Sequence, residues 1–282
     1  MVRVVHTIAE LNKILSPLWR KGDPVGFVPT MGALHDGHVS LMKQARADGN
    51  ELVVASVFVN PLQFGSGEDY DEYPRDLNGD VKVAKDAHVD VVFAPSVAEM
   101  YPRGFLTYVD QDKLTDKLCG AHRPGHFRGV LTVVLKLLNV VRPTHAYFGQ
   151  KDYQQAVVIQ RMATDLNLDV KLHVMPIIRE PDGLAMSSRN AYLGSKHRQE
   201  ALVLHQALAR AHELVTAGER NVRKLSGEIK KVIGQSKSAK VDYISVVHPE
   251  TLEDLNDISG KSVIAVAARF GKTRLIDNVI VE

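Results

Sequence analysis

Short runs of β-branched and aromatic residues alternate with longer amphipathic stretches through the first two thirds of this chain, and this alternation most constrains its fold. The strand-like runs lie at 25–29, 51–59, 89–95, 145–149 and 170–176. They are almost continuously apolar, as in strands that are buried on both faces of a parallel sheet, and helical patterns follow most of them. The pattern therefore predicts an α/β fold with a parallel sheet between two layers of helices.

The order of helical and strand-like patterns changes after about residue 184. Two long charged helical patterns come first, and three strand-like runs follow, at 195–218, 219–236, 241–248, 262–270 and 273–281. Helices followed by strands are typical of an α+β unit. We therefore predict a Rossmann-like domain over residues 1–183 and a smaller α+β lid domain over residues 184–282.

Composition argues against several classes of protein. A chain of 282 residues can bury a substantial core, and a formal net charge of +2 leaves no broad basic field for nucleic acid. Cys119 is the only cysteine, which excludes an intrachain disulfide and fits a reducing compartment. The N-terminal stretch is too charged for a signal peptide, and Lys136 interrupts the longest apolar run. We expect a cytoplasmic protein that binds small molecules, and neither nucleic acid nor a membrane.

The stretch PTMGALHDGHVSL, residues 29–41, directly follows the first of these strands. Gly32 and Gly37 permit a tight turn, and we expect His38 to open the next helix, whose free N–H groups favour an anion. His35 and His38 stand three apart, whereas the zinc ligands of metalloproteases stand four apart around a glutamate. Alone, this stretch leaves open a phosphate-binding turn and a purely structural turn.

Three further segments carry polar side chains at strand ends or a domain junction, where ligands of parallel α/β sheets bind. Their sequences are SVFVNPLQF, with Asn60 and Gln63; FGQKDYQQ, with Lys151, Asp152, Gln154 and Gln155; and REPDGLAMSSRNAYL, with Ser187, Ser188 and Arg189. The amides suit hydroxyls or a carboxylate, and the lysine, serines and arginine suit phosphate. Each segment alone is equally compatible with ordinary turn and capping chemistry.

In this order, the segments resemble the pantothenate synthetase (pantoate–β-alanine ligase) family. The matching stretches are TMGALHDGH, FVNPLQF, RPGHFRGV, FGQKDYQQ and DGLAMSSRN. Five ordered matches over nearly the whole chain are far more specific than any one of them. The wider superfamily comprises nucleotidyltransferases related to class I aminoacyl-tRNA synthetases, which bind ATP between a paired-histidine turn and a second loop that AMSSR resembles.

The resemblance implies a ligase activity: ATP-dependent condensation of (R)-pantoate with β-alanine to pantothenate, AMP and pyrophosphate, through pantoyl adenylate. Such transfer needs in-line positioning and charge neutralisation more than a covalent nucleophile. The resemblance also implies that residues 1–183 form the ATP- and pantoate-binding domain, that Mg²⁺ accompanies ATP, and that the protein is a homodimer. Two alternatives are another nucleotidyltransferase of the superfamily and a nucleotide-binding regulator that has lost catalysis.

The resemblance also implies roles for individual residues. The implied catalytic group comprises His38 as proton donor, His35 on the phosphates, and the cations Lys151 and Arg189. The implied ATP-binding residues are Met31, Gly32, Ala33, Leu34, His35, Asp36, Gly37, His38, Gly149, Gln150, Lys151, Asp152, Ile178, Met186, Ser187, Ser188 and Arg189. Those implied for pantoate or β-alanine are Gln63, Gln155 and Asn60.

Two positions depart from the pattern that the resemblance leads us to expect. Cys119 stands where the resemblance leads us to expect a glutamate. Gly79 interrupts an acidic cluster that the resemblance leads us to expect near Mg²⁺. The metal ligands are therefore unassigned, with Asp80 as a candidate. An exposed Cys119 would be a thiol to test for oxidation. The charge of His38 is undecided, because a helix N-terminus disfavours imidazolium whereas a bound triphosphate favours it.

Overall fold

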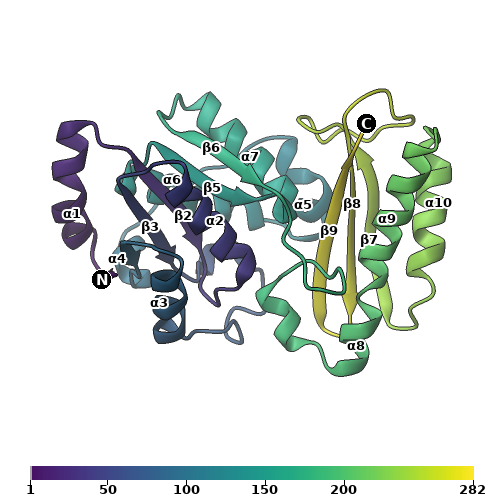
Figure 1. The fold of residues 1–282 in the computed structure, drawn as a ribbon, viewed down its shortest axis with the longest axis horizontal. Coiled ribbons are helices and arrows are strands. Elements are labelled where there is room, and N and C mark those ends of the chain that lie inside the picture. Colours follow the sequence, from purple (N-terminus) through teal and green to yellow (C-terminus); the bar gives the residue numbers. More distant parts are fainter. Residues whose placement is uncertain (1) are drawn as a thin grey trace.

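The computed structural model describes residues 2–282, which form a large parallel sheet and a smaller antiparallel sheet side by side (Figure 1). In spatial order the large sheet contains β1 (Arg3–Val5), β4 (Val91–Phe93), β3 (Leu52–Val57), β2 (Val25–Thr30), β5 (His145–Gly149) and β6 (Lys171–Met175). All its paired strands are parallel. The predicted parallel sheet is confirmed.

Helices cover both faces of the large sheet, and this explains its continuously apolar strands. The helices are α1 (Ile8–Lys21), α2 (Asp36–Ala47), α3 (Leu77–Asp86), α4 (Val97–Met100), α5 (Leu118–His122), α6 (His126–Val141) and α7 (Tyr153–Asp165). In β2, Phe27 faces a core that includes residues of α1 and α6, whereas Val28 faces a core that includes residues of α2 and α3. Neighbouring residues of one strand are thus buried on opposite faces.

The second unit packs two helices against an antiparallel sheet. Its elements are α8 (Ser195–Glu200), α9 (Val203–Thr216), α10 (Val222–Ile233), β7 (Ala239–Val247), β8 (Ser262–Phe270) and β9 (Thr273–Val281). Leu204, Ile229 and Val266 belong to a core cluster formed within this unit. The predicted α+β fold class is confirmed, whereas the domain boundary at 183/184 stays a prediction. The single helix predicted over 195–218 is wrong, because α8 ends at Glu200 and α9 begins at Val203.

The order of the strands reverses beside β2, and this creates the crevice that holds the site. From β2 the chain continues to β3 and β4 on one side, whereas β5 and β6 lie on the other. Strands β2 and β5 pair only through Gly26 with His145 and Phe27 with Ala146. Beyond these pairs the two strands are no longer bonded to each other, and their carboxyl ends leave room for a ligand.

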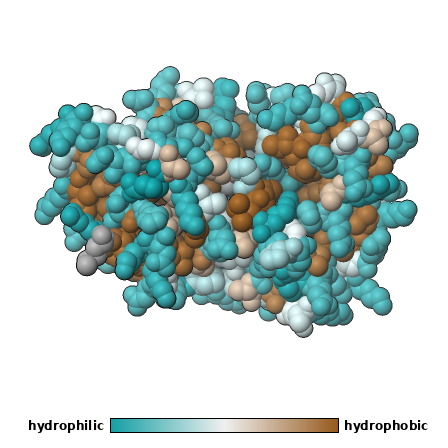
Figure 2. Space-filling model, viewed as in Figure 1, coloured by the Kyte–Doolittle hydropathy of each residue, from teal (hydrophilic) through white to brown (hydrophobic). Residues whose placement is uncertain are grey.

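Hydrophilic side chains predominate on the face shown in Figure 2, where hydrophobic side chains form small separate groups. Within residues 2–282, no helix combines the length and the hydropathy that a membrane crossing requires.

Candidate active site

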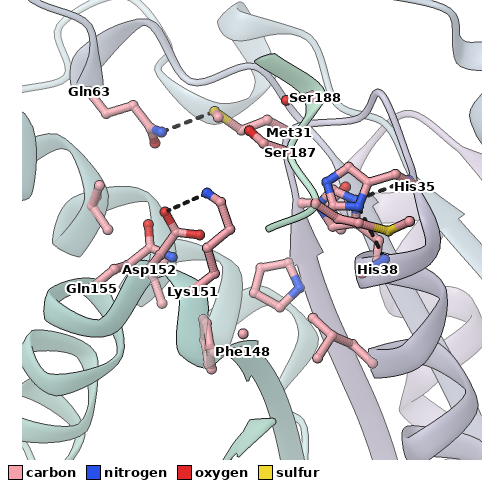
Figure 3. A pocket seen from close by; sticks show the side chains of 18 of the residues that line it. Met31, His35, His38, Gln63, Phe148, Lys151, Asp152, Gln155, Ser187 and Ser188 are labelled. Carbon is pink, nitrogen blue, oxygen red and sulfur yellow. Dashed lines mark hydrogen bonds and ion pairs between the residues drawn. The ribbon is translucent and has the colours of Figure 1, made fainter. Parts of the chain in front are cut away.

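A cavity of about 220 Å³ lies at the carboxyl ends of β2 and β5. It brings together residues from all the segments singled out in the sequence (Figure 3). The predicted residues that line it are Met31, His35, Gly37, His38, Asn60, Gln63, Gly149, Lys151, Asp152, Gln155, Ile178, Met186, Ser187, Ser188 and Arg189. The predicted ATP-binding residues outside its lining are Gly32, Ala33, Leu34, Asp36 and Gln150.

The turn between β2 and α2 is held by a buried carboxylate. Asp80 accepts hydrogen bonds from the backbone N–H groups of Ala33, at 3.1 Å, and Leu34, at 2.8 Å. Gly32 and Ala33 have positive φ angles of 83° and 51°, and a Cβ at position 32 would lie 2.7 Å from Asp80 Oδ2. Only glycine therefore fits at position 32 without displacement. Burial raises the pKa of Asp80, against the opposing effect of these two hydrogen bonds.

This geometry gives Asp80 a different function from the one considered in the sequence. Both of its carboxylate oxygens already accept a backbone N–H. Asp80 therefore stabilises the turn, and its geometry gives no support to the suggestion that it assists Mg²⁺. The turn residues outside the cavity lining shape the backbone around it.

The two histidines use the same ring nitrogen, Nδ1, to accept a backbone N–H. His35 is the N-cap of α2, and its Nδ1 accepts the N–H of Gly37 at 3.2 Å. His38 Nδ1 accepts the N–H of His35 at 3.3 Å. Because Nδ1 is the acceptor in both neutral rings, the proton lies on Nε2. The sequence led us to expect His38 as the first residue of this helix. The helix instead begins at Asp36, and His38 is its third residue.

Burial keeps both histidines uncharged. It lowers the pKa of His38 to about 3, with smaller contributions from neighbouring His35 and Lys151. It lowers the pKa of His35 to about 4, again with Lys151 acting in the same direction. The ring centroids are 4.1 Å apart, so the two rings form one group of neutral N–H donors (Figure 3). This answers the question of their charge for the ligand-free protein.

Lys151 provides a positive charge across the crevice from these histidines. It lies in η3 (Gln150–Asp152), a 3₁₀ helix that follows β5. Its side chain is 19% exposed, and Nζ is 3.8 Å from Asp152 Oδ1. In Figure 3 the amine points into the space between Gln63 and the histidine pair. A phosphate group in that space would be attracted by both the ammonium and the N-terminus of α2.

Gln63 and Asn60 are joined by a hydrogen bond, but only Gln63 is suited to a substrate. Asn60 Nδ2 donates to Gln63 Oε1 and to the carbonyl of Gly129, both at 3.1 Å. Asn60 Oδ1 accepts from the Tyr101 hydroxyl at 2.8 Å and from the N–H of Leu62 at 3.3 Å. With its hydrogen-bonding capacity filled, Asn60 positions Gln63. The prediction that Asn60 binds substrate is therefore not supported by its geometry.

The neighbouring glutamines of α7 have different surroundings. Gln154 is buried, accepts from the N–H of Cys119 at 2.9 Å, and donates to the carbonyls of Leu114 and Lys117. Gln155 lines the cavity instead. Gln154 is thus structural, whereas contact between Gln155 and a substrate stays a prediction. Cys119 is itself buried, so the suggestion of an exposed thiol is wrong.

The segment after Ile178 covers the cavity opposite the histidine turn. The N–H of Met186 donates to the carbonyl of Ile178 at 3.0 Å, and a Cβ at Gly37 would lie 3.8 Å from Met186 Cβ. Ser187 caps η4 (Ser188–Tyr192) by accepting the N–H of Arg189 at 3.2 Å. The predicted two-sided arrangement around the cavity is present.

Tyr73, Arg123 and His126 are among the lining residues to which our sequence analysis gave no role. Arg123 Nη1 lies 3.0 Å from His126 Nε2, and His126 Nδ1 lies 2.8 Å from the carbonyl of Gln63. Burial lowers the pKa of His126 to about 4, and the charge of Arg123 contributes. The Tyr73 hydroxyl lies 2.9 Å from Ser188 Oγ. The stretch RPGHFRGV was the available signal for Arg123 and His126.

Comparisons with known proteins agree with this arrangement. A sequence profile described as Pantoate-beta-alanine ligase matches residues 3–280. A pantothenate synthetase of Heliobacterium modesticaldum is 54% identical over 281 residues, which cover 100% of both chains. The crystal structure of pantothenate synthetase from Thermus thermophilus is 48% identical, with a TM-score of 0.94 and coverage of 99% of each chain.

A third relative was solved with ligands. The crystal structure of pantoate-beta-alanine ligase from Francisella tularensis, complexed with beta-gamma ATP and beta-alanine, is 37% identical with a TM-score of 0.82. The alignment covers 99% of this chain and 98% of the other. From the full-length match of profile, sequence and fold, the chain belongs to the pantoate–β-alanine ligase family.

Proposed function

We propose that this chain condenses (R)-pantoate with β-alanine at the expense of ATP, and releases pantothenate, AMP and pyrophosphate. The observation that carries the proposal is one cavity that combines an anion-binding helix N-terminus, Lys151 and two amides, Gln63 and Gln155. These groups suit a substrate pair made of a polyphosphate and a hydroxy acid. Family membership, and the ATP and β-alanine bound to the Francisella relative, point to the same substrates.

The first step would form pantoyl adenylate. A carboxylate oxygen of pantoate attacks the α-phosphorus of ATP, and the bond from that phosphorus to the bridging oxygen breaks, so its electron pair leaves with pyrophosphate. Negative charge grows on the phosphate oxygens during this displacement. The Nε2–H groups of His35 and His38 and the ammonium of Lys151 would stabilise that charge, because they are fixed by the fold before the reaction begins.

The second step would form the amide bond. The uncharged amine of β-alanine attacks the acyl carbon of pantoyl adenylate, the acyl–oxygen bond to AMP breaks, and the new amide nitrogen loses a proton. We assign Gln63 to contacts with pantoate and β-alanine and Gln155 to pantoate. The hydrogen bond from Asn60 fixes the orientation of the Gln63 amide. Its N–H₂ group donates one hydrogen to Met31 Sδ at 3.0 Å, and the second hydrogen is available to a substrate.

We propose that Mg²⁺ enters with ATP, coordinated by phosphate oxygens and water. Within residues 2–282, no group of three or more His, Cys, Asp or Glu side chains is placed to hold a metal ion. The metal would therefore shield the phosphates of its own substrate complex. Exchange activity should disappear with a chelator and return with added Mg²⁺.

We also propose a homodimer, which the family resemblance implies. The location in the cytoplasm and separate domains at residues 1–183 and 184–282 are proposed from the sequence pattern. Sedimentation velocity of the purified chain tests the dimer: a single species of twice the monomer mass supports it, and a monomer at micromolar concentration contradicts it.

The exchange of labelled pyrophosphate into ATP tests the ligase directly. We expect exchange that depends on pantoate, followed by AMP release when β-alanine is added. Exchange with a different acid but not with pantoate would favour another nucleotidyltransferase. ATP binding without exchange would favour a regulator that has lost catalysis.

A further inference from the structure

Two consecutive carboxylates hold the two arginines that line the cavity. Asp69 accepts from Arg189 Nε at 2.8 Å and Nη2 at 2.9 Å. Glu68 accepts from Arg123 Nε at 2.7 Å and Nη2 at 2.6 Å. Each pair is bidentate. The Nε and Nη2 donors of each guanidinium, which could otherwise bind a phosphate or a carboxylate, are therefore occupied by the protein itself.

Both ion pairs are sheltered from water. Arg189 and Asp69 are 25% and 23% exposed, and Arg123 and Glu68 are 14% and 26% exposed. Burial acts to raise the pKa of Glu68, but the hydrogen bonds and charge of Arg123 prevail and lower it to about 2. Such sheltered bidentate pairs are stronger than ordinary surface ion pairs, so they compete effectively with other anions.

The two carboxylates belong to the segment 65–72, which we call the acidic segment; its charged residues are Glu68, Asp69, Asp71 and Glu72. It lines a second cleft of about 1040 Å³, which shares Arg123 and Arg189 with the substrate cavity. The hydroxyl of Tyr192 also donates to the carbonyl of Glu72 at 3.3 Å. The segment is therefore bonded both to Arg123, at the end of α5, and to Arg189 and Tyr192 of η4.

ATP bound beside Arg189 would compete with Asp69 for the Nε–H and Nη2–H groups. The family resemblance implies that this arginine binds the phosphates of ATP. Its Nε and Nη2 donors already hold a carboxylate, which is negatively charged like the phosphates. A triphosphate beside Arg189 would repel Asp69 while competing for the same N–H groups. Arg123 is in the same position toward the carboxylate of an acid substrate.

We infer that the acidic segment binds the two arginines in place of the substrate anions. Asp69 stays paired with Arg189 until the triphosphate of ATP displaces it. Glu68 stays paired with Arg123 until the carboxylate of an acid substrate displaces it. The segment neutralises the arginines in the ligand-free protein, and it moves aside when substrate arrives. This inference rests on the proposed function only for the identity of the anion.

Calorimetric titration with MgATP, without pantoate, tests the inference. Asp69→Asn removes the competing charge, and we expect MgATP to bind roughly fivefold more tightly than to the wild type, as for the loss of about one such ion pair. Asp71→Asn is the matched control, because it removes the same charge from an exposed residue of the same segment that takes no part in either pair. We expect it to change the affinity less than about twofold.

Repeating the titration in an Arg189→Met protein shows whether the effect depends on the Asp69–Arg189 ion pair. In an Arg189→Met protein, Asp69→Asn should no longer tighten binding, because there is no guanidinium to release. Weaker or unchanged MgATP binding by Asp69→Asn would overturn the inference and make Asp69 a residue that positions Arg189. An equal effect of Asp71→Asn would overturn it as well, by reducing it to general electrostatics.

The binding test is independent of the ligase assignment. Tighter MgATP binding by Asp69→Asn in a protein that exchanges pyrophosphate with another acid would support the inference and contradict the proposed substrate. Pantoate-dependent exchange, with no change in MgATP affinity in Asp69→Asn, would support the proposed substrate and contradict the inference.

Discussion

His38 Nδ1 accepts the backbone N–H of His35 at 3.3 Å, and this contact decides that Nε2 is the ring nitrogen that carries the proton. The Nε2–H remains as the free donor, and burial keeps the ring neutral. His38 therefore acts in this account as a fixed hydrogen-bond donor beside the helix N-terminus. Its charge in the presence of ATP depends on how far the triphosphate offsets the cost of burial.

Replacing His38 by alanine should slow pantoate-dependent exchange by roughly a hundredfold, because one preorganised donor to the developing charge is lost. Lys151→Ala should have an effect of about the same size, since it removes the cation on the opposite side. The matched control is His212→Ala, an exposed position on α9. Near wild-type exchange in both site variants, with normal folding, would show that these roles are wrong.

The stability of the ligand-free protein should fall in mild acid, partly because of His38. The pKa of His38 is about 3 in the folded protein against an ordinary value of 6.5, so the unfolded chain binds more protons below pH 6.5. Unfolding is therefore favoured as the pH falls through this range. Between about pH 7.5 and 5.5, His38 should account for a loss of about 1.4 kcal/mol, the equivalent of one pH unit.

Urea unfolding at these two pH values measures the effect. The variant His38→Gln should lose less stability on acidification than the wild type, whereas the exposed control His212→Gln should lose as much as the wild type. An equal loss in the wild type and His38→Gln would mean that His38 takes up its proton without unfolding.

Asp80→Asn should loosen the turn that precedes α2. An amide in place of the carboxylate presents N–H₂ to at least one of the N–H groups of Ala33 and Leu34, which leaves a buried donor unpaired. We expect a loss of about 1–3 kcal/mol in unfolding free energy and a higher KM for ATP. The control is Asp86→Asn, exposed at the end of the same helix. Unchanged stability and KM would contradict the role of Asp80.

Asn60 should act through Gln63 rather than on substrate directly. Asn60→Ala should lower kcat/KM for pantoate, because it frees the Gln63 amide to rotate. In a Gln63→Ala background, the same change should have little further effect on kcat/KM. Independent effects of the two substitutions would instead support a direct contact between Asn60 and substrate.

The location of the site was predictable from sequence more readily than the roles within it. Strand ends are marked by apolar runs, and the rule for ligands in parallel sheets then brings the histidine turn and Lys151 together. The short β1 was missed, because three residues including Arg3 make no recognisable run. The helical pattern of 195–218 likewise continues across the break after Glu200, so nothing in it marks the interruption.

Roles that depend on distant contacts could not be predicted. Asp80 meets the turn from 46 and 47 positions away, and Asn60 meets Gly129 from 69 positions away. Gln154 and Gln155 are adjacent and chemically identical, and only their orientation on α7 separates a structural residue from one that lines the cavity. The arrangement of neighbours around each amide or carboxylate, rather than its type, decides its function here.

The transfer of oxygen from pantoate tests the central claim most directly. Pantoate labelled with oxygen-18 in its carboxylate would be incubated with MgATP and β-alanine, and the AMP and pyrophosphate analysed by mass spectrometry. Attack on the α-phosphorus predicts one labelled oxygen in AMP and none in pyrophosphate. Label in pyrophosphate or inorganic phosphate, or unlabelled AMP, would contradict an adenylate intermediate and with it the chemistry assigned to this cavity.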